Sequence, residues 1–132
     1  MASIDPQNPG DAVRTFLDEY HLASLTIVKG NGEPHVTAVG FTYEPETQIA
    51  RVITWADSWK AKHLDQLGEA QAAICTVDGV RWLTLSGVAS VTNDPEAIAI
   101  GVSCYADRYR PPKERDDRVV IEMRVSNITG RA

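Results

Sequence analysis

The stretch that decides the fold is "AQAAICTVDGVRWLTLSGVASV", residues 70–91. Two runs rich in apolar and β-branched residues flank Asp78-Gly79, a dipeptide that strongly favours a tight hairpin turn. Gly87 interrupts the second run, where a residue without a side chain is typical of a β-bulge. The stretch therefore predicts two antiparallel strands, residues 70–77 and 81–91, joined by that turn.

The sequence on both sides of this hairpin contains four more strand-like runs. Residues 22–28 and 35–43 flank the turn-like "KGNGEP" and predict a second hairpin. Residues 48–55 carry apolar side chains on both faces, which indicates a strand that is partly buried on both sides. Residues 118–125 form the final apolar run. With the central hairpin, these runs give six predicted strands.

Three segments between the strands carry helix signals. In the first, apolar residues recur at i, i+3, i+4 and i+7 after Asp11, the expected N-cap; they are Val13, Phe16, Leu17 and Tyr20. Ser58 is the expected N-cap of a second helix, residues 58–67, which Gly68 closes. Asp94-Pro95 begins a third helix, residues 94–109, which ends before Pro111-Pro112. We expect these helices at the edges of the sheet.

Strands joined mainly by hairpin turns predict a mainly β fold with peripheral helices. A doubly wound parallel sheet would need a helical crossover between most strands, and this sequence lacks such crossovers. We therefore expect a six-stranded antiparallel β-barrel, whose closure also protects its edge strands. The 132 residues leave room for one domain, spanning 1–132, with residues 1–10 as a flexible N-terminus.

Composition argues against several classes of partner. With a formal net charge of −5, the chain lacks the broad basic footprint that nucleic acid or an anionic membrane requires. No apolar run approaches the roughly 18 residues of a membrane span, and the first residues do not resemble a secretion signal, so we expect a cytoplasmic protein. The cysteines and histidines lack metal-ligand spacing, and we assign no metal site.

The stretch "RVITWADSWKAKHL", residues 51–64, places a short basic helix directly after a strand. If Ser58 caps this helix, its free N–H groups and its dipole create a local site for an anion. Lys60 and His63, three positions apart, share a helix face and could reach one phosphate or carboxylate. Lys62 lies on nearly the opposite side. The alternative interpretation of these residues is an ordinary solvated helix face.

Three motifs, in this order, resemble those of a known family: "PHVTAVGF" from Pro34, "ARVIT" from Ala50 with the lysine that follows, and "DGVRWL" from Asp78. The likeness covers nearly the whole chain. It is to the split-barrel flavin/deazaflavin oxidoreductases of actinobacteria, which are related to pyridoxamine phosphate oxidase. Within them, the sequence is most similar to the biliverdin reductases that use coenzyme F420. The resemblance implies a split β-barrel of the FMN-binding type.

The resemblance also implies where a cofactor would bind. Proteins of this kind are homodimers that hold each cofactor in a groove between subunits. The segments matching residues 36–39 and 53–55 lie beside the deazaflavin ring, the turn matching 58–60 holds the phosphate, and the neighbouring subunit contributes the hairpin matching 80–82. Relatives often carry asparagine at the position of His63. The implied cofactor-binding residues are Val36, Thr37, Ala38, Val39, Ile53, Thr54, Trp55, Ser58, Trp59, Lys60, His63, Val80, Arg81 and Trp82.

For function, the resemblance implies hydride transfer from reduced F420 to biliverdin or a similar conjugated acceptor. This agrees with a sequence that has no motif for a catalytic nucleophile, because hydride transfer mainly requires the protein to position cofactor and acceptor. The accompanying proton would come from Arg81, another cation or ordered water. Arg108 or Arg110 could meet the propionates of a tetrapyrrole. The alternatives are an FMN-dependent oxidoreductase on the same barrel and a non-enzymatic carrier of a cofactor or tetrapyrrole.

Overall fold

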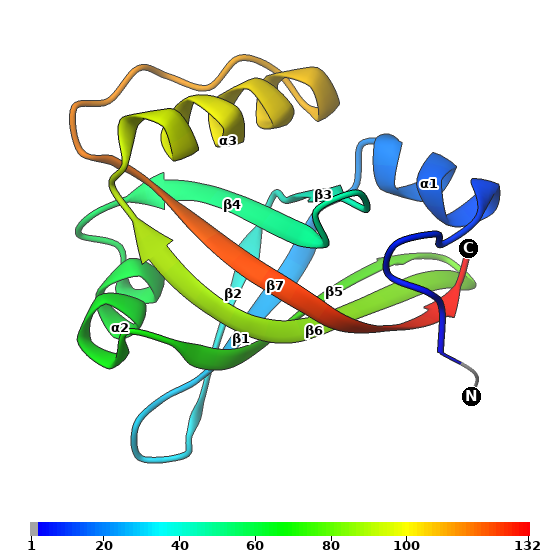
Figure 1. The fold of residues 1–132 in the computed structure, drawn as a ribbon, viewed down its shortest axis with the longest axis horizontal. Helices are drawn as coiled ribbons and strands as arrows, with labels where there is room; N and C mark the ends of the chain where they lie inside the picture. The colour runs from blue at the N-terminus through cyan, green and yellow to red at the C-terminus, as the bar shows by residue number, and fades with distance from the viewer. Residues whose placement is uncertain (1–2) are drawn as a thin grey trace.

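The computed structural model describes residues 3–132 as three helices around one antiparallel sheet (Figure 1). The helices are α1 (Asp11–Asp18), α2 (Trp59–Leu67) and α3 (Pro95–Arg108). The strands are β1 (Ala23–Val28), β2 (Pro34–Val39), β3 (Thr42–Glu44), β4 (Ile49–Trp55), β5 (Ala70–Asp78), β6 (Arg81–Thr92) and β7 (Arg118–Arg131). The predicted class, mainly β with peripheral helices, is confirmed.

All seven strands belong to a single sheet, in the order β2-β1-β5-β6-β7-β4-β3. Every neighbouring pair is antiparallel. β2 and β3 occupy opposite ends of this order, although only Gly40 and Phe41 separate them along the chain. The sheet must therefore curl until its two ends meet, which makes it a barrel.

The expectation of six strands is wrong, because the run 35–43 forms two strands instead of one. β2 pairs with β1, whereas β3 leaves that hairpin and pairs with β4. Tyr109 fixes the corner between them: its hydroxyl accepts the Phe41 N–H at 3.1 Å and donates to the His21 carbonyl at 2.6 Å. The corner depends on a side chain 68 residues away in sequence, which a local pattern of apolar residues cannot reveal.

The central hairpin forms as the sequence predicts. Asp78 pairs with Arg81 across a two-residue turn in which Gly79 has a φ of 64°. The register of β6 against β7 shifts immediately before Gly87, which confirms the bulge. A Cβ atom at Gly87 would overlap the carbonyl oxygen of Arg124, so only glycine fits this close approach of two strands.

β7 continues to Arg131, whereas the prediction ended at residue 125. The extension "SNITGR" is mostly polar and contains Gly130, so its composition does not indicate a strand. It forms because β6 is long enough to pair with it, with Trp82 opposite Arg131. Ile128 anchors the extension, since its side chain is fully buried and its carbonyl accepts the Ile4 N–H at 2.7 Å.

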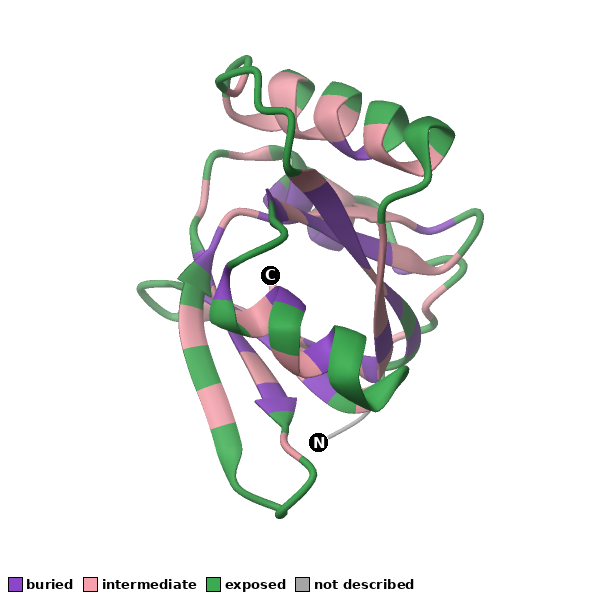
Figure 2. Ribbon diagram, turned by 90° about the vertical axis from the view of Figure 1, so that its left-hand side faces the viewer, coloured by how far each residue is buried: buried purple, intermediate pink, exposed green. Residues whose placement is uncertain are grey.

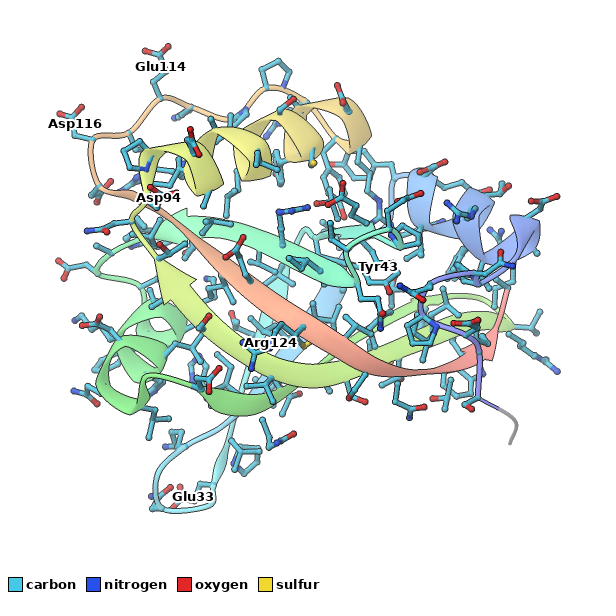
Figure 3. All side chains as sticks on the ribbon, viewed as in Figure 1. Glu33, Tyr43, Asp94, Glu114, Asp116 and Arg124 are labelled. Atoms are coloured by element: carbon cyan, nitrogen blue, oxygen red, sulfur yellow. The ribbon has the colours of Figure 1, made fainter. Side chains whose placement is uncertain are left out.

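The second and third helices begin where the sequence predicts. Ser58 is the N-cap of α2, and its hydroxyl accepts the Ala61 N–H. Asp94 is the N-cap of α3, and its carboxylate accepts the Ala97 N–H; Figure 3 labels Asp94 at the junction of β6 and α3. Gly68 closes α2 with a φ of 77°. These signals are local in sequence, which is why they could be identified correctly.

α1 differs from its prediction at both ends. Gly10, with a φ of 91°, is the N-cap, whereas Asp11 is the first helical residue and its expected role as N-cap is wrong. Glycine tolerates this positive φ at little cost. Val13, Phe16 and Leu17 are buried as predicted. Tyr20 lies beyond the end of the helix and is exposed, so it does not belong to the buried face.

α3 lies along one side of the barrel, over β4 and β7 (Figures 1 and 2). Gly101 is its one buried residue. A Cβ atom at Gly101 would lie 2.9 Å from a methyl carbon of Val120 and 3.1 Å from one of Ile53. The missing side chain therefore lets the helix approach the strands closely, and this approach sets the height of the helix above β4.

The segment before α1 contacts the barrel in two places. Ile4 forms a backbone bridge with Ile128, and the Tyr43 hydroxyl donates to the Pro6 carbonyl at 2.6 Å. Residues 1 and 2, which the expectation of a flexible N-terminus also includes, lie outside the described residues. No helix within residues 3–132 is both long and apolar enough to cross a bilayer. Cys75 and Cys104 are free thiols.

Candidate functional site

A groove of about 380 Å³ opens between β2 and β4. This volume lies within the roughly 300–1,000 Å³ that is typical of small-molecule sites. Seven of the predicted cofactor-binding residues line it: Thr37, Ala38, Val39, Ile53, Thr54, Trp55 and Lys60. The other lining residues are Gly40, Val52, Tyr105, Pro112 and Arg118. The groove is therefore built by β2, β4, α2, α3 and the start of β7.

The groove exists because the barrel is split at this position. β2 pairs only with β1, and β4 pairs with β3 only over residues 49–51. Among the strands of residues 3–132, none pairs with the free edges at residues 37–40 and 52–55, and Figure 2 shows the exposed and intermediate residues that alternate along β2. Backbone N–H and C=O groups at such edges can hydrogen-bond a flat ligand that carries both donors and acceptors.

The β4–α2 junction is held by a buried pair of hydroxyl groups. The Thr54 hydroxyl donates to the Ser58 hydroxyl oxygen at 3.0 Å, and this oxygen also accepts the Ala61 N–H at 3.3 Å. Both side chains are buried. The first turn of α2, with its free N–H groups and the positive end of the helix dipole, is thereby fixed at the end of β4.

Lys60 in this turn is a cation that forms no ion pair within residues 3–132. Its ammonium nitrogen lies 5.2 Å from the centre of the Trp55 ring, and Arg115 lies on the same ring at 5.0 Å but is ion-paired with Asp117. Partial burial lowers the pKa of Lys60, and no acidic side chain in the described part of the chain pairs with it. A partly desolvated ammonium group of this kind is suited to an anionic ligand.

Arg118 is a second cation in the groove, and sequence reasoning missed it. It donates to the carbonyls of Thr54 at 3.4 Å and Lys113 at 2.7 Å, and burial lowers its pKa. Arg118 begins β7 directly opposite Trp55 of β4. Only the pairing of β4 with β7 reveals this proximity, because the two residues are far apart in the sequence.

Tyr105 of α3 forms another wall that the sequence did not identify. Its ring packs 4.9 Å from that of Tyr109. A Cβ atom at Gly40 would lie 3.0 Å from the Tyr105 ring and 3.2 Å from the Tyr109 ring, so glycine at this position lets both rings approach the end of β2. The helical spacing of the tyrosines predicts that they share a face, but it does not predict what that face contacts.

The remaining predicted site residues lie outside this groove. Val36 faces the outer surface of the sheet, and so does Trp82, which is opposite Val77 in the hairpin. Val80 is exposed in the β5–β6 turn. Figure 1 shows this turn at the end of the molecule near α1, and α2 at the other end. Within one chain, the structure does not bring the hairpin residues to Lys60.

Trp59 and His63 also lie on α2 but do not line the groove. The Trp59 ring is stacked on the His63 ring, with their centres 6.0 Å apart. The His63 ring also lies 4.9 Å from that of His35 on β2. Lys62 is directed elsewhere, as predicted, and lies 4.0 Å from the carboxylate of Asp57. His35 was not among the predicted site residues.

Arg81 is held by acidic residues near α1. Its guanidinium group pairs with Asp78 at 2.5 Å and with Glu19 at 3.0 Å. Hydrogen bonds from His21 and then Arg81 hold the pKa of Glu19 below its ordinary value. Glu19, His21 and Asp78 lie close enough for their ligand atoms to share an ion, but Arg81 already neutralises both carboxylates.

Arg108 is engaged inside the fold. It donates to the carbonyls of Glu19 at 2.9 Å and Phe41 at 2.5 Å, and its guanidinium carbon lies 4.7 Å from the centre of the Phe41 ring. Burial lowers its pKa. Arg108 thus ties α3 to the corner between β2 and β3, and the expectation that it meets a propionate does not agree with this position. Arg110 is exposed.

Solved structures of other proteins share this fold, and two of them illustrate the likeness. An F420 reductase superimposes with a TM-score of 0.70 at 20% identity, covering 91% of this chain and 98% of that one. The heme storage protein HutZ from Vibrio cholerae superimposes with a TM-score of 0.71 at 17% identity, covering 89% and 91%. At such low identity the likeness is one of fold alone.

Sequence comparison gives a closer relationship. The chain is 46% identical over 122 residues to the F420H2-dependent biliverdin reductase of Mycobacterium tuberculosis, which covers 92% of this chain and 88% of that protein. The model of the pyridoxamine 5'-phosphate oxidase family matches residues 9–132. Both matches span nearly the whole barrel and all of the groove, and the chain therefore belongs to the pyridoxamine 5'-phosphate oxidase family.

Proposed function

We propose that this protein transfers a hydride from reduced coenzyme F420 to biliverdin or a similar conjugated acceptor. The observation that carries the proposal is Lys60, a partly buried cation that has no acidic partner within residues 3–132. It lies in the first turn of α2, beside a groove with two unpaired strand edges. The M. tuberculosis relative, at 46% identity, is an F420H2-dependent biliverdin reductase. The free thiols of Cys75 and Cys104 are compatible with the reducing cytoplasm, where we expect the protein to work.

The residues of the groove fit a phosphate-bearing deazaflavin. When bound, the reduced coenzyme supplies the hydride. The edges at residues 37–40 and 52–55 offer backbone donors and acceptors to a flat ring system. Tyr105 and Trp55 are aromatic walls that exclude water from such a ring. Lys60 and the free N–H groups of the α2 first turn are placed for the phosphate. The chain thus positions its ligands and needs no nucleophile.

A homodimer would complete the site. The outer face of β1, β2 and β5 forms a shallow surface lined by Leu22, Ala23, Ser24, Val36, Thr37, Ala38, Cys75 and Val77, with no charged residue among them. Leu22, Val36 and Val77 expose 59%, 59% and 62% of their surface. Large exposed apolar patches of this kind mark interfaces. We propose that a second copy covers this face and brings Val80, Arg81 and Trp82 to the groove of its partner.

Lys60 provides the direct test of the cofactor assignment. Lys60→Ala should weaken the binding of F420 about tenfold or more, because one charge-assisted hydrogen bond to phosphate is lost. Fluorescence titration of the purified protein with F420 measures this change. Lys62→Ala is the matched control, since Lys62 lies on the same helix but points to Asp57. Tight binding of FMN without binding of F420, or unchanged F420 affinity in Lys60→Ala, would contradict the proposal.

A further inference from the structure

Two histidines that are 28 positions apart in the sequence meet beyond the Lys60 end of the groove. His35 of β2 precedes Thr37, a lining residue, by two positions, so both side chains lie on the same side of the strand about 6.6 Å apart along it. His63 follows Lys60 by three positions and lies on the same face of α2. Their rings, 4.9 Å apart, therefore continue the row of groove residues from both sides.

The charges that face this histidine pair are positive. Burial is the main cause of a lowered pKa at His35, followed by the charges of His63, Lys29 and Lys60. Lys29 is partly neutralised by Glu33 at 3.8 Å, but no carboxylate in the described part of the chain pairs with His35, His63 or Lys60. Such surroundings repel a metal cation. A histidine pair can bind either a metal cation or an anion, and the positive surroundings favour the anion.

The neighbouring Trp59 adds a flat apolar surface to the pair. Its ring is stacked on that of His63 with an interplanar angle of 28°, and 66% of the residue is exposed. Lys62 lies over the same ring, 4.9 Å from its centre. An anion bound between the imidazoles would therefore have an aromatic surface beside it for the carbon skeleton that carries its charge.

We infer that His35 and His63 form a carboxylate-binding site that prolongs the groove beyond the phosphate position of Lys60. The inference rests on the proposed function for the identity of its ligands. Two ligands of that reaction carry carboxylates: the glutamate tail of F420 and the propionates of biliverdin. Both offer the same chemistry to the pair, and the experiment separates them.

The site must bind its anion together with a proton. In the free protein, burial and the neighbouring positive charges favour neutral imidazole at His35. A bound carboxylate favours the imidazolium form and raises the pKa, so binding takes up a proton. The affinity of the histidine pair for a carboxylate should therefore increase as the pH falls through the range in which histidine titrates, and it should decrease above that range. Phosphate binding at Lys60 would not show this dependence near neutral pH, because lysine stays charged there.

The first arm of the test examines the coenzyme. Isothermal titration calorimetry at pH 6 and pH 8 compares F420 with the form that lacks glutamates, in two buffers of different ionisation enthalpy. If the tail occupies the site, the complete coenzyme gains affinity at pH 6 with proton uptake, and the shortened form does not. His35→Gln and His63→Gln should each reduce this gain about tenfold, as expected for the loss of one charge-assisted hydrogen bond.

The second arm examines the acceptor without the coenzyme. Absorbance titration at the same two pH values compares biliverdin with its dimethyl ester, which keeps the conjugated skeleton and loses both charges. If a propionate occupies the site, only biliverdin binds more tightly at pH 6, and the two glutamine variants abolish the difference. Arg14→Gln is the control, because it removes a positive charge from α1, where Arg14 pairs with Glu46 at 3.5 Å.

The outcomes distinguish this inference from the proposed function. Proton-linked binding of either carboxylate ligand that disappears in both glutamine variants supports the site. If F420 binds and biliverdin is reduced, but neither arm shows a proton-linked difference, the site is refuted and the proposed function stands. If the wild-type protein binds no F420, the proposed function fails, while the second arm still decides whether the histidine pair binds a carboxylate.

Discussion

At the scale of single residues, Ser58 connects the fold to the candidate site. Its hydroxyl oxygen accepts the Ala61 N–H, which caps α2, and it also accepts the hydroxyl proton of Thr54 in β4. The same turn of helix carries Lys60. The position of this lysine relative to the unpaired edge of β4 thus depends on one buried hydroxyl group.

Ser58→Ala should lower the free energy of unfolding by about 1–2 kcal/mol, since it removes the cap and leaves the buried Thr54 hydroxyl without its acceptor. It should also weaken F420 binding, because the first turn of α2 loses its anchor. Urea unfolding and fluorescence titration measure the two effects. Ser58→Thr keeps the oxygen and should preserve most of both. Full stability in Ser58→Ala would show that the cap contributes nothing.

The candidate site shows which residues local reasoning can find. Lys60 was identified because its relation to Ser58 spans one helical turn. Arg118, Tyr105 and His35 were missed because each reaches the site through strand pairing or helix packing between distant segments. Residues 37–39 and 53–55 were identified through the resemblance to a family. They matter through their backbone edges, so their side chains give no sign of a role in the site.

At the scale of elements, the correct predictions rest on turn and cap residues that act within a few positions of the chain. Asp78-Gly79, Asp94-Pro95 and Gly68 each fix φ or supply a cap within a few residues. The break at Gly40 and the length of β7 depend on Tyr109 and on β6, respectively. The sequence therefore predicted the central hairpin and the caps of α2 and α3 correctly, whereas it misplaced the N-cap of α1 and predicted poorly where an element owes its bounds to a distant partner.

Gly87→Ala tests the bulge in the pairing of β6 with β7. The new methyl group would overlap the Arg124 carbonyl oxygen, so the strands must separate, and we expect a loss of about 1–3 kcal/mol in the free energy of unfolding. Gly30→Ala is the matched control, because its Cβ would meet the Leu67 side chain at an ordinary 3.4 Å. Urea midpoints compare the two variants. Equal stability of both would mean that the bulge tolerates a side chain.

At the scale of the whole molecule, the split in the barrel accounts for both the groove and the outer apolar surface. β2 ends the sheet order and pairs on one side only, so one of its edges lines the groove. Its outward residues, Val36 and Ala38, belong to the uncharged face of β1, β2 and β5. A second copy bound to that face would lie next to the groove, so the proposed dimer and the proposed cofactor site are linked by one strand.

The double variant Val36→Glu, Val77→Glu places charges on this face and should convert the dimer to a monomer, because each carboxylate would be buried without a partner. The monomeric variant should also bind F420 more weakly, since the partner's hairpin no longer reaches the groove. Sedimentation velocity and fluorescence titration measure both changes. Ile100→Glu, on the exposed side of α3, should alter neither. A wild-type protein that sediments as a monomer at micromolar concentration would refute the dimer, and retained affinity in a monomeric variant would show that one chain suffices to hold the coenzyme.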